Sequence, residues 1–397
     1  MWARLRQCCI VHSTAKRKGM DSEATETSQK SQGAVVTYSP QEHGYRDSHE
    51  RVTRTEIGRR LAALKGYAFA GEYDCSVCYS GPVYFIPSDT LLAREATDLG
   101  IRSEHDLFGG VAPYGFVATK AITHSLVDPH AHAPTGWSLE FGRRVQDAVL
   151  FGFTAFSHDD ARHAAARLLE RGPARTKPVR ASAGRDQTVI STAAELEAVL
   201  KEIEPAELSH SGLVLEENLT DVVTYSVGQV RVAELVATYH GIQRLITDNR
   251  GEAVYGGSDL VVARGEFDAL LGLDLSDEVR LAVSQACIYD TAAMELYPGL
   301  FASRRNYDVA AGLGPQGQRR CGVLEQSWRM GGASGAEIAA LEAFRAEPTL
   351  EAICASTFET YGAAEPPPHA IVYFRGEDEQ IGPMTKYTIV ESYGEAR

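Results

Sequence analysis

Short apolar or alternating runs predict strands along this chain, and polar residues at fixed spacings predict where helices begin. Residues 213–215 form an apolar run, while residues 224–231 and 233–239 alternate or run apolar, as sheet strands do. Three residues stand three positions before an acidic residue, the signal of a helix N-terminus: Thr53, Ser157 and Thr192. The mixture of strands and helices predicts an α/β (α+β) protein.

A strand–loop–strand unit is predicted between the helices that begin near Ser157 and Thr192. Lys177 lies near the end of the first strand, and the small-residue loop 181–187 follows it. A lysine in this place can direct its ammonium group at phosphates, which the backbone N–H groups of such a loop can approach. The alternative interpretation is a surface lysine at a strand end.

A predicted hairpin near the C-terminal end carries one carboxylate on each strand. Asp308 precedes the Gly-rich turn 311–318, and Glu325 follows it. The hairpin would bring both acids to one edge, and Mg²⁺ is commonly held by one or two carboxylates together with phosphate oxygens. Solvated strand carboxylates are the alternative. Three arginines beside the acids favour a phosphate and metal site: Arg304, Arg305 and Arg329.

Two further segments are candidates for contact with a nucleotide base. Glu216, Glu217 and Asn218 follow the apolar run 213–215, where backbone groups and an acidic side chain could recognise adenine. Lys120 could contact the base from the opposite wall. A polar strand terminus and a structural lysine are the corresponding alternatives.

Charge and cysteine usage restrict the class of protein. The chain has 39 basic and 53 acidic residues, a net charge of −14, which argues against nucleic acid as a partner. No apolar run approaches the roughly 20 residues of a membrane span, so we expect no membrane partner. Seven scattered cysteines suit a reducing compartment, and we expect a cytoplasmic protein. Acidic nucleotide enzymes of this size often dimerise, so a homodimer is one expected state. The motifs Cys75-x-x-Cys78 and His130-x-His132 could bind metal, but loop residues are the simpler interpretation.

The order of these segments resembles the ATP-grasp superfamily over residues 115–345. The whole chain is similar to an uncharacterised bacterial ATP-grasp-like family sometimes labelled biotin carboxylase-like. The segments that carry this second likeness are residues 38–40, 106–110 and 304–308. The resemblance implies an N-terminal α/β lobe followed by two α+β lobes that clasp a nucleotide.

Five parts of the chain follow from the patterns and the resemblance together. Residues 1–33 are expected to be a disordered N-terminal tail, because their second half is rich in Ser, Thr, Gln and Glu. Residues 34–120 form the N-terminal lobe. Residues 121–215 and 216–345 form the first and second ATP-grasp lobes, and residues 346–397 form a C-terminal extension.

The resemblance also implies roles for individual residues. Lys120 and Lys177 would flank the nucleotide, and the loop with Gly184 and Arg185 would cover its phosphates. Adenine would be read at the segment from Glu216 through Glu217 to Asn218. The carboxylate of Asp221 would replace a ribose-binding Glu that is common near the position of Thr224.

The metal and catalytic roles fall on the predicted hairpin. Asp308, Glu325 and Ser327 would hold Mg²⁺, with Ser327 standing where the family pattern usually has Asn. Arg329 and Arg305 would be catalytic, through charge neutralisation and substrate contact.

The expected function is that of a Mg-ATP-dependent ligase. ATP would activate a small-molecule carboxylate as an acyl phosphate, which an amine or similar nucleophile would attack. Two alternatives are an ATP-dependent phosphotransferase and a non-catalytic nucleotide-binding regulator. The departures at Ser327 and Thr224 favour the regulator.

Overall fold

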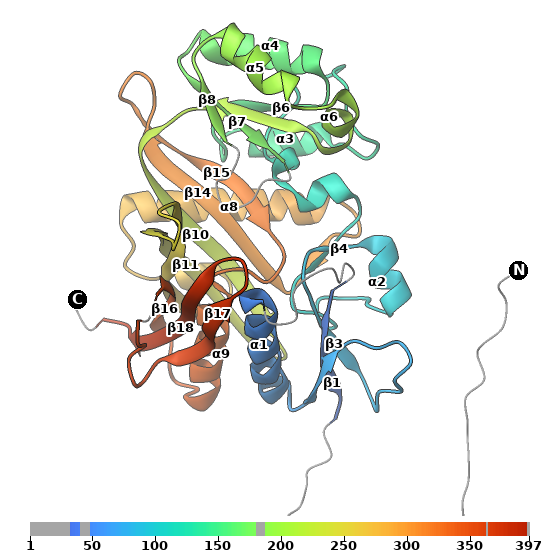
Figure 1. The fold of residues 1–397 in the computed structure, drawn as a ribbon, viewed down its shortest axis with the longest axis vertical. Coiled ribbons are helices and arrows are strands. Elements are labelled where there is room, and N and C mark those ends of the chain that lie inside the picture. The colour runs from blue at the N-terminus through green and yellow to red at the C-terminus, as the bar shows by residue number, and fades with distance from the viewer. Residues whose placement is uncertain (1–31, 40–47, 180–186, 363, 395–397) are drawn as a thin grey trace, which may run out of the picture. The chain divides into compact units, whose positions relative to one another are not determined.

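The strands described by the computed structural model fall into four sheets. The model describes residues 32–39, 48–179, 187–362 and 364–394. The predicted tail therefore lies almost wholly outside the described residues, as do Gly184 and Arg185. Figure 1 shows the arrangement of the helices and strands.

The first sheet is parallel and has the strand order β2-β1-β3. Its strands are β1 (Ala34–Tyr38), β2 (Ala68–Glu72) and β3 (Val83–Pro87). Helix α1 (His49–Lys65) packs against β1 and β2. The prediction that this helix begins at Thr53 is wrong, because Ser48 caps it one turn earlier by accepting a hydrogen bond from the backbone N–H of Arg51.

A small sheet connects this lobe to the rest of the fold. It has the order β13-β5-β4, from β13 (Phe301–Ala302), β5 (Gly110–Ala112) and β4 (Leu91–Leu92). Helix α2 (Ala93–Leu99) follows β4 directly, and the 3₁₀ turns η1 (Gly115–Ala118) and η2 (Lys120–Thr123) follow β5. Gly110 is required where the sheet meets the chain after β15, since an added Cβ would lie 2.8 Å from Cβ of Trp328.

The third sheet contains four strands in the order β6-β9-β7-β8. They are β6 (Gly152–Ala155), β9 (Leu213–Glu217), β7 (Ala174–Pro178) and β8 (Thr188–Ile190). The capping predictions for Ser157 and Thr192 are confirmed: they cap α4 (His158–Leu169) and α5 (Ala193–Lys201), and Thr192 forms a full capping box with Glu195. These helices, with α6 (Pro205–Ser211), bury an Ala- and Leu-rich core against the sheet.

The largest sheet has eight antiparallel strands. In order across the sheet they are β15 (Arg319–Ser327), β14 (Arg304–Leu313), β10 (Thr220–Val232), β11 (Leu235–Thr247), β12 (Ala253–Arg264), β16 (Ala352–Tyr361), β18 (Gly382–Ser392) and β17 (Ile371–Asp378). The alternating pattern predicted for β10 and β11 covers only part of each 13-residue strand. Residues of the predicted C-terminal extension supply three strands of this same sheet.

Two long helices pack on opposite faces of the large sheet. Helix α8 (Asp277–Leu296) contacts β10, β14 and β15, and its core includes Val227 and Tyr307. Helix α9 (Ser334–Ala346) contacts β11, β16 and β18, and its core includes Val230 and Tyr239. Since side chains alternate between faces along a strand, these two cores lie on the two sides of the sheet. The short helices α3 (Leu139–Val145) and α7 (Phe267–Leu271) complete the α8 side.

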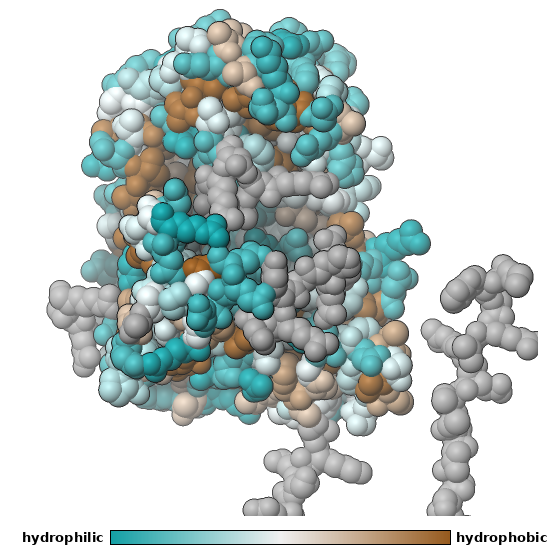
Figure 2. Space-filling view, in the orientation of Figure 1, coloured by the Kyte–Doolittle hydropathy of each residue, from teal (hydrophilic) through white to brown (hydrophobic). Residues whose placement is uncertain are grey.

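The surface in the view of Figure 2 is mostly hydrophilic, with hydrophobic residues in small separate patches.

Candidate functional site: a carboxylate pair and two lysines

The predicted hairpin forms, and it places Asp308 and Glu325 directly opposite each other. Strands β14 and β15 pair Asp308 with Glu325 and Asn306 with Ser327. Directly opposed residues share one face of a sheet, with Cβ atoms typically about 5 Å apart. The register shifts by one residue immediately beyond this pair, so that Leu324 forms a β-bulge. The two acids therefore lie side by side on the α9 face of the sheet.

Hydrogen bonds fix the position of the Asp308 carboxylate. Gln243 Nε2 donates to Asp308 Oδ1 at 2.9 Å, and Asn306 Nδ2 donates to the same oxygen at 3.0 Å. Burial, followed by repulsion from Glu325, raises the pKa of Asp308 to about 6, although these hydrogen bonds oppose the rise. The site thus has more negative charge than its protein partners neutralise.

Lys120 lies beside the acid pair. Its Nζ is 2.9 Å from Glu325 Oε2, and its side chain is only 7 % exposed. The turn η2 that carries Lys120 is capped by Thr119, and Thr123 Oγ1 donates to the backbone carbonyl of Leu324 at 3.1 Å. The structure thus places Lys120 at the carboxylates, and its contact with a nucleotide base stays a prediction.

A second buried cluster contains Lys177, Glu216 and His124. Lys177 Nζ lies 2.5 Å from Glu216 Oε1, and His124 Nε2 lies 3.0 Å from Glu216 Oε2. All three side chains are 6 % exposed or less. Burial alone raises the pKa of Glu216, but Lys177 and His124 outweigh it and lower the pKa to about 2. Glu216 is thus held as a carboxylate.

The two residues that follow Glu216 in the sequence form hydrogen bonds with other residues of the protein. Glu217 accepts hydrogen bonds from the Phe151 backbone N–H at 3.0 Å and from Arg320 Nη2 at 2.6 Å. Asn218 Oδ1 accepts one from Arg175 at 2.8 Å. Asp221 is exposed and has a positive φ of 51° at the bulge near the start of β10. Among these predicted nucleotide contacts, the structure brings only Glu216 to a lysine.

Arg305 does not join the acid pair. It is three positions from Asp308 on one strand, so it projects from the opposite face. There it contacts Asp290 of α8 at 2.9 Å and donates to Gln229. Arg329 follows β15, and its Nε is 3.4 Å from Asp89, which follows β3. Ser327 is held near Arg304, whose Nη1 is 3.4 Å from Ser327 Oγ.

A buried polar chain behind Asp308 could not be predicted from the sequence. Tyr239 Oη lies 2.5 Å from Glu337 Oε1 of α9 and 2.9 Å from Asn306 Oδ1, so its one hydroxyl proton is shared between these two oxygens. Glu337 is fully buried and pairs with Arg304, with Nη2 at 2.8 Å. Arg304 in turn donates to the backbone carbonyl of Arg329 at 2.5 Å. This chain connects the carboxylate pair to α9.

The carboxylate oxygens at this site fit a hard cation that is bound by the protein and by phosphate oxygens together. Asp308 and Glu325 offer two carboxylates, and their mutual repulsion favours a divalent ion between them. No group of three or more His, Cys, Asp or Glu residues gathers anywhere in the described parts of the chain, so a zinc-type cluster is not seen there. Cys75 and Cys78 are exposed free thiols, and His132 Nε2 is hydrogen-bonded to Ser209.

Comparison with solved structures identifies the fold. Phosphoribosylamine–glycine ligase from Thermotoga maritima matches with a TM-score of 0.50 at 12 % identity, over 90 % of this chain and 91 % of that one. A carboxyaminoimidazole ribonucleotide synthase from Aspergillus clavatus, complexed with ATP, matches at 11 % identity with a TM-score of 0.43, over 90 % and 94 % of the two chains. D-alanine–D-alanine ligase from Bacillus anthracis matches at 12 % identity with a TM-score of 0.43, over 75 % and 86 %.

The predicted ATP-grasp fold is therefore confirmed: the protein has the fold of the ATP-grasp ligases. Within that class, the chain belongs to the DUF3182 family, described as proteins of unknown function, whose model matches residues 35–388. No curated protein matches the sequence. In the portion of the chain that the structure describes, no helix is both long and apolar enough to cross a lipid bilayer.

Proposed function

We propose that this protein is a Mg-ATP-dependent ligase that activates a small-molecule carboxylate as an acyl phosphate for attack by an amine or a similar nucleophile. One observation carries the proposal: Asp308 and Glu325 lie opposite each other on the hairpin, and Lys120 lies against Glu325. In an ATP-grasp fold, this arrangement suits the phosphate end of a nucleotide. We place the activity in the cytoplasm, in keeping with the scattered cysteines.

The reaction balances as two transfers. The carboxylate attacks the γ-phosphorus of ATP and releases ADP, which gives an acyl phosphate. The amine then attacks the acyl carbon and expels inorganic phosphate, and the amide nitrogen loses a proton. A bound Mg²⁺ would supply charge neutralisation at the phosphates, with Asp308 and Glu325 as its protein ligands. Such transfers depend mainly on positioning and electrostatics.

The residues of the chain contribute a fixed frame for these steps. Gln243 and Asn306 orient the Asp308 carboxylate, and Lys120 orients that of Glu325. Lys120 also supplies a positive charge for a phosphate oxygen. The Lys177 ammonium, held by Glu216, would meet the nucleotide in the neighbouring lobe. Arg329, close to Asp89, would contact the anionic substrate.

A non-catalytic nucleotide-binding regulator is the second candidate, and the environment of Ser327 favours it. Arg304 lies 3.3 Å from the backbone carbonyl of Ser327 and 3.4 Å from its hydroxyl. That hydroxyl is a weaker ligand than the amide oxygen usual in this place, and it stands beside a cation. A protein of this kind would bind Mg-ATP without hydrolysing it.

Measurement of ADP release from Mg-ATP with mixtures of carboxylates and amines tests the proposal. We expect ADP and phosphate only when a carboxylate is present, and Glu325→Ala should lower the rate at least about 100-fold, as loss of a transition-state electrostatic contact does. The matched control is Glu377→Ala, an exposed glutamate on β17. Full activity of Glu325→Ala would refute the metal assignment. Tight Mg-ATP binding without ADP in every mixture would support the regulator instead.

A further inference from the structure

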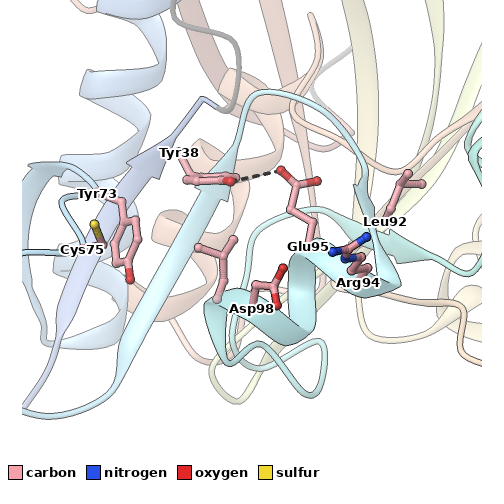
Figure 3. A pocket seen from close by; sticks show the side chains of 8 residues that line it. Tyr38, Tyr73, Cys75, Leu92, Arg94, Glu95 and Asp98 are labelled. Carbon is pink, nitrogen blue, oxygen red and sulfur yellow. Dashed lines mark hydrogen bonds between the residues drawn. The ribbon is translucent and has the colours of Figure 1, made fainter. Parts of the chain in front are cut away.

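A hollow of about 360 Å³ lies in the N-terminal lobe (Figure 3), and neither Asp308 nor Glu325 lines it. It is lined by the end of β1 at Tyr38, by Tyr73 just after β2, and by residues of β4 and α2 that follow β3. The parallel strands have the order β2-β1-β3, so the chain changes direction across the sheet at β1. Ligands of open α/β sheets bind outside the carboxyl ends of the strands at such a point.

The walls of the hollow are apolar and held in place. The rings of Tyr38 and Tyr73 meet edge to face with centroids 6.2 Å apart, and Tyr73 stacks on Tyr79 at 5.8 Å. Leu92 and Leu99 complete the apolar lining. Tyr38 Oη donates to Glu95 Oε1 at 3.0 Å, the bond drawn in Figure 3. Burial and then Glu95 raise the pKa of Tyr38 to about 12, so the hydroxyl remains a donor.

Three charged side chains from α2 face the same hollow. Glu95 and Asp98 are three positions apart and Arg94 and Asp98 four, so all three lie on neighbouring parts of one helix surface. Figure 3 shows the Glu95 carboxylate directed toward the Tyr38 hydroxyl, with Asp98 near it on the same helix. Within the described ranges, the side chains of Arg94 and Asp98 form no hydrogen bond and no ion pair. Glu95 accepts the Tyr38 hydrogen bond with Oε1, which leaves Oε2 available to a ligand.

We propose that this hollow binds a small amino-carboxylate with an apolar body, independently of the nucleotide site. Its ammonium group would lie between Glu95 and Asp98, near the electron-rich faces of the tyrosine rings. Its carboxylate would pair with Arg94, whose planar guanidinium suits two carboxylate oxygens. The body would rest on Tyr73, Leu92 and Leu99. A phosphate-bearing ligand is disfavoured, since carboxylates outnumber the one arginine. The volume is at the lower end of the range for small-molecule sites.

Three probes of one shape test the two charges separately. They are L-leucine, 3-methylbutylamine, which lacks the carboxylate, and 4-methylpentanoate, which lacks the amine. Ligand-observed NMR with the full-length protein and no nucleotide gives their affinities. We expect leucine to bind at least about tenfold more tightly than either analogue, since one charge-assisted hydrogen bond accounts for such a factor. Equal affinities for the three probes would overturn the proposal. So would the absence of detectable leucine binding at about 20 mM, which is about twenty times a Kd of about 1 mM.

Substitutions of exposed residues then locate the site. Arg94→Gln and Asp98→Asn should each weaken leucine binding about tenfold, while Arg102→Gln and Asp274→Asn, two exposed residues outside the hollow, should leave it unchanged. Unchanged binding in both test variants would place leucine elsewhere and refute the proposal. Glu325→Ala separates this site from the proposed ligase activity. Leucine binding should persist in that variant, and its loss there would refute the independence of the two sites.

Discussion

The two lysine–carboxylate clusters differ in how completely the protein satisfies them. In the cluster of Lys177, Glu216 and His124, every charged side chain is at most 6 % exposed, and both oxygens of Glu216 have a partner. On the hairpin, one lysine faces two acids, and Glu325 is 34 % exposed. The charges of Lys177 and Glu216 balance without a ligand, so we call this the complete cluster, although His124 Nδ1 has no hydrogen-bond partner among the described residues. The second has an excess of negative charge, and the pKa of Asp308 is raised to about 6 by burial and by Glu325.

This difference predicts which effect of a substitution is larger in each cluster. A buried lysine that loses its partner costs the fold several kcal/mol, whereas removal of one of two neighbouring acids also relieves their repulsion and costs less. The complete cluster should therefore matter most for stability. The incomplete one should matter most for ligands.

Removal of each acid gives the largest contrast. Glu216→Ala leaves Lys177 buried without its partner and should lower the free energy of unfolding by about 3–5 kcal/mol. Glu325→Ala removes the partner of Lys120 but also relieves the repulsion on Asp308, so it should cost less than Glu216→Ala does. Guanidinium chloride unfolding of both variants measures the two effects. Equal losses would show that the two clusters do not differ in this way.

Acid should weaken the complete cluster in a defined window. Burial raises the pKa of Glu216 but its two partners lower it from 4.5 to about 2 in the folded protein, so the folded state binds this proton less readily than the unfolded chain. The stabilisation is therefore full above pH 4.5 and is lost as the pH falls toward 2. Between pH 5.5 and pH 3 the protein should lose about 2 kcal/mol more than Glu216→Gln does. Parallel losses in the two proteins would contradict the ion pairing.

A smaller effect is expected behind the hairpin, where the chain passes from β15 to α9. An added Cβ at Gly332 would lie 2.4 Å from the Tyr255 ring, while one at Gly331 would have no atom closer than 3.6 Å. Gly332→Ala should cost about 1–3 kcal/mol through overpacking, with Gly331→Ala as the near-neutral control. Thermal unfolding of both variants provides the measurement. A larger loss for Gly331→Ala would show that the loop packs differently.

Local signals in the sequence predicted much of the fold. The capping signals at Ser157 and Thr192 and the Gly-rich turn before Glu325 each act over a few residues, and the structure contains the two helices and the hairpin. The prediction of a helix start at Thr53 was wrong because a capping signal at one position cannot exclude a better cap, here Ser48, one turn earlier. The overall ATP-grasp fold was implied by the resemblance of these segments, in their order, to the ATP-grasp superfamily.

Contacts between distant segments were not predictable in the same way. Lys120 contacts Glu325, which is 205 positions away in the sequence. Glu337 contacts Tyr239 from the buried side of α9, and the sequence of α9 contains no signal of this contact. Glu217 looked free to bind a base, yet Arg320 binds it. Arg305 is different, since its odd spacing from Asp308 already places it on the other face of the strand.

The extra residue in the hairpin, Leu324, has a consequence for protein engineering. Its removal would let β14 and β15 pair without interruption, and Asp308 and Glu325 would still be opposed. The deletion would also remove the backbone carbonyl of Leu324, which accepts a hydrogen bond from Thr123 Oγ1. The turn η2, which carries Lys120, would then lose this bond to β15. A one-residue deletion would thus loosen the turn that carries the lysine while the pair of acids stays opposed.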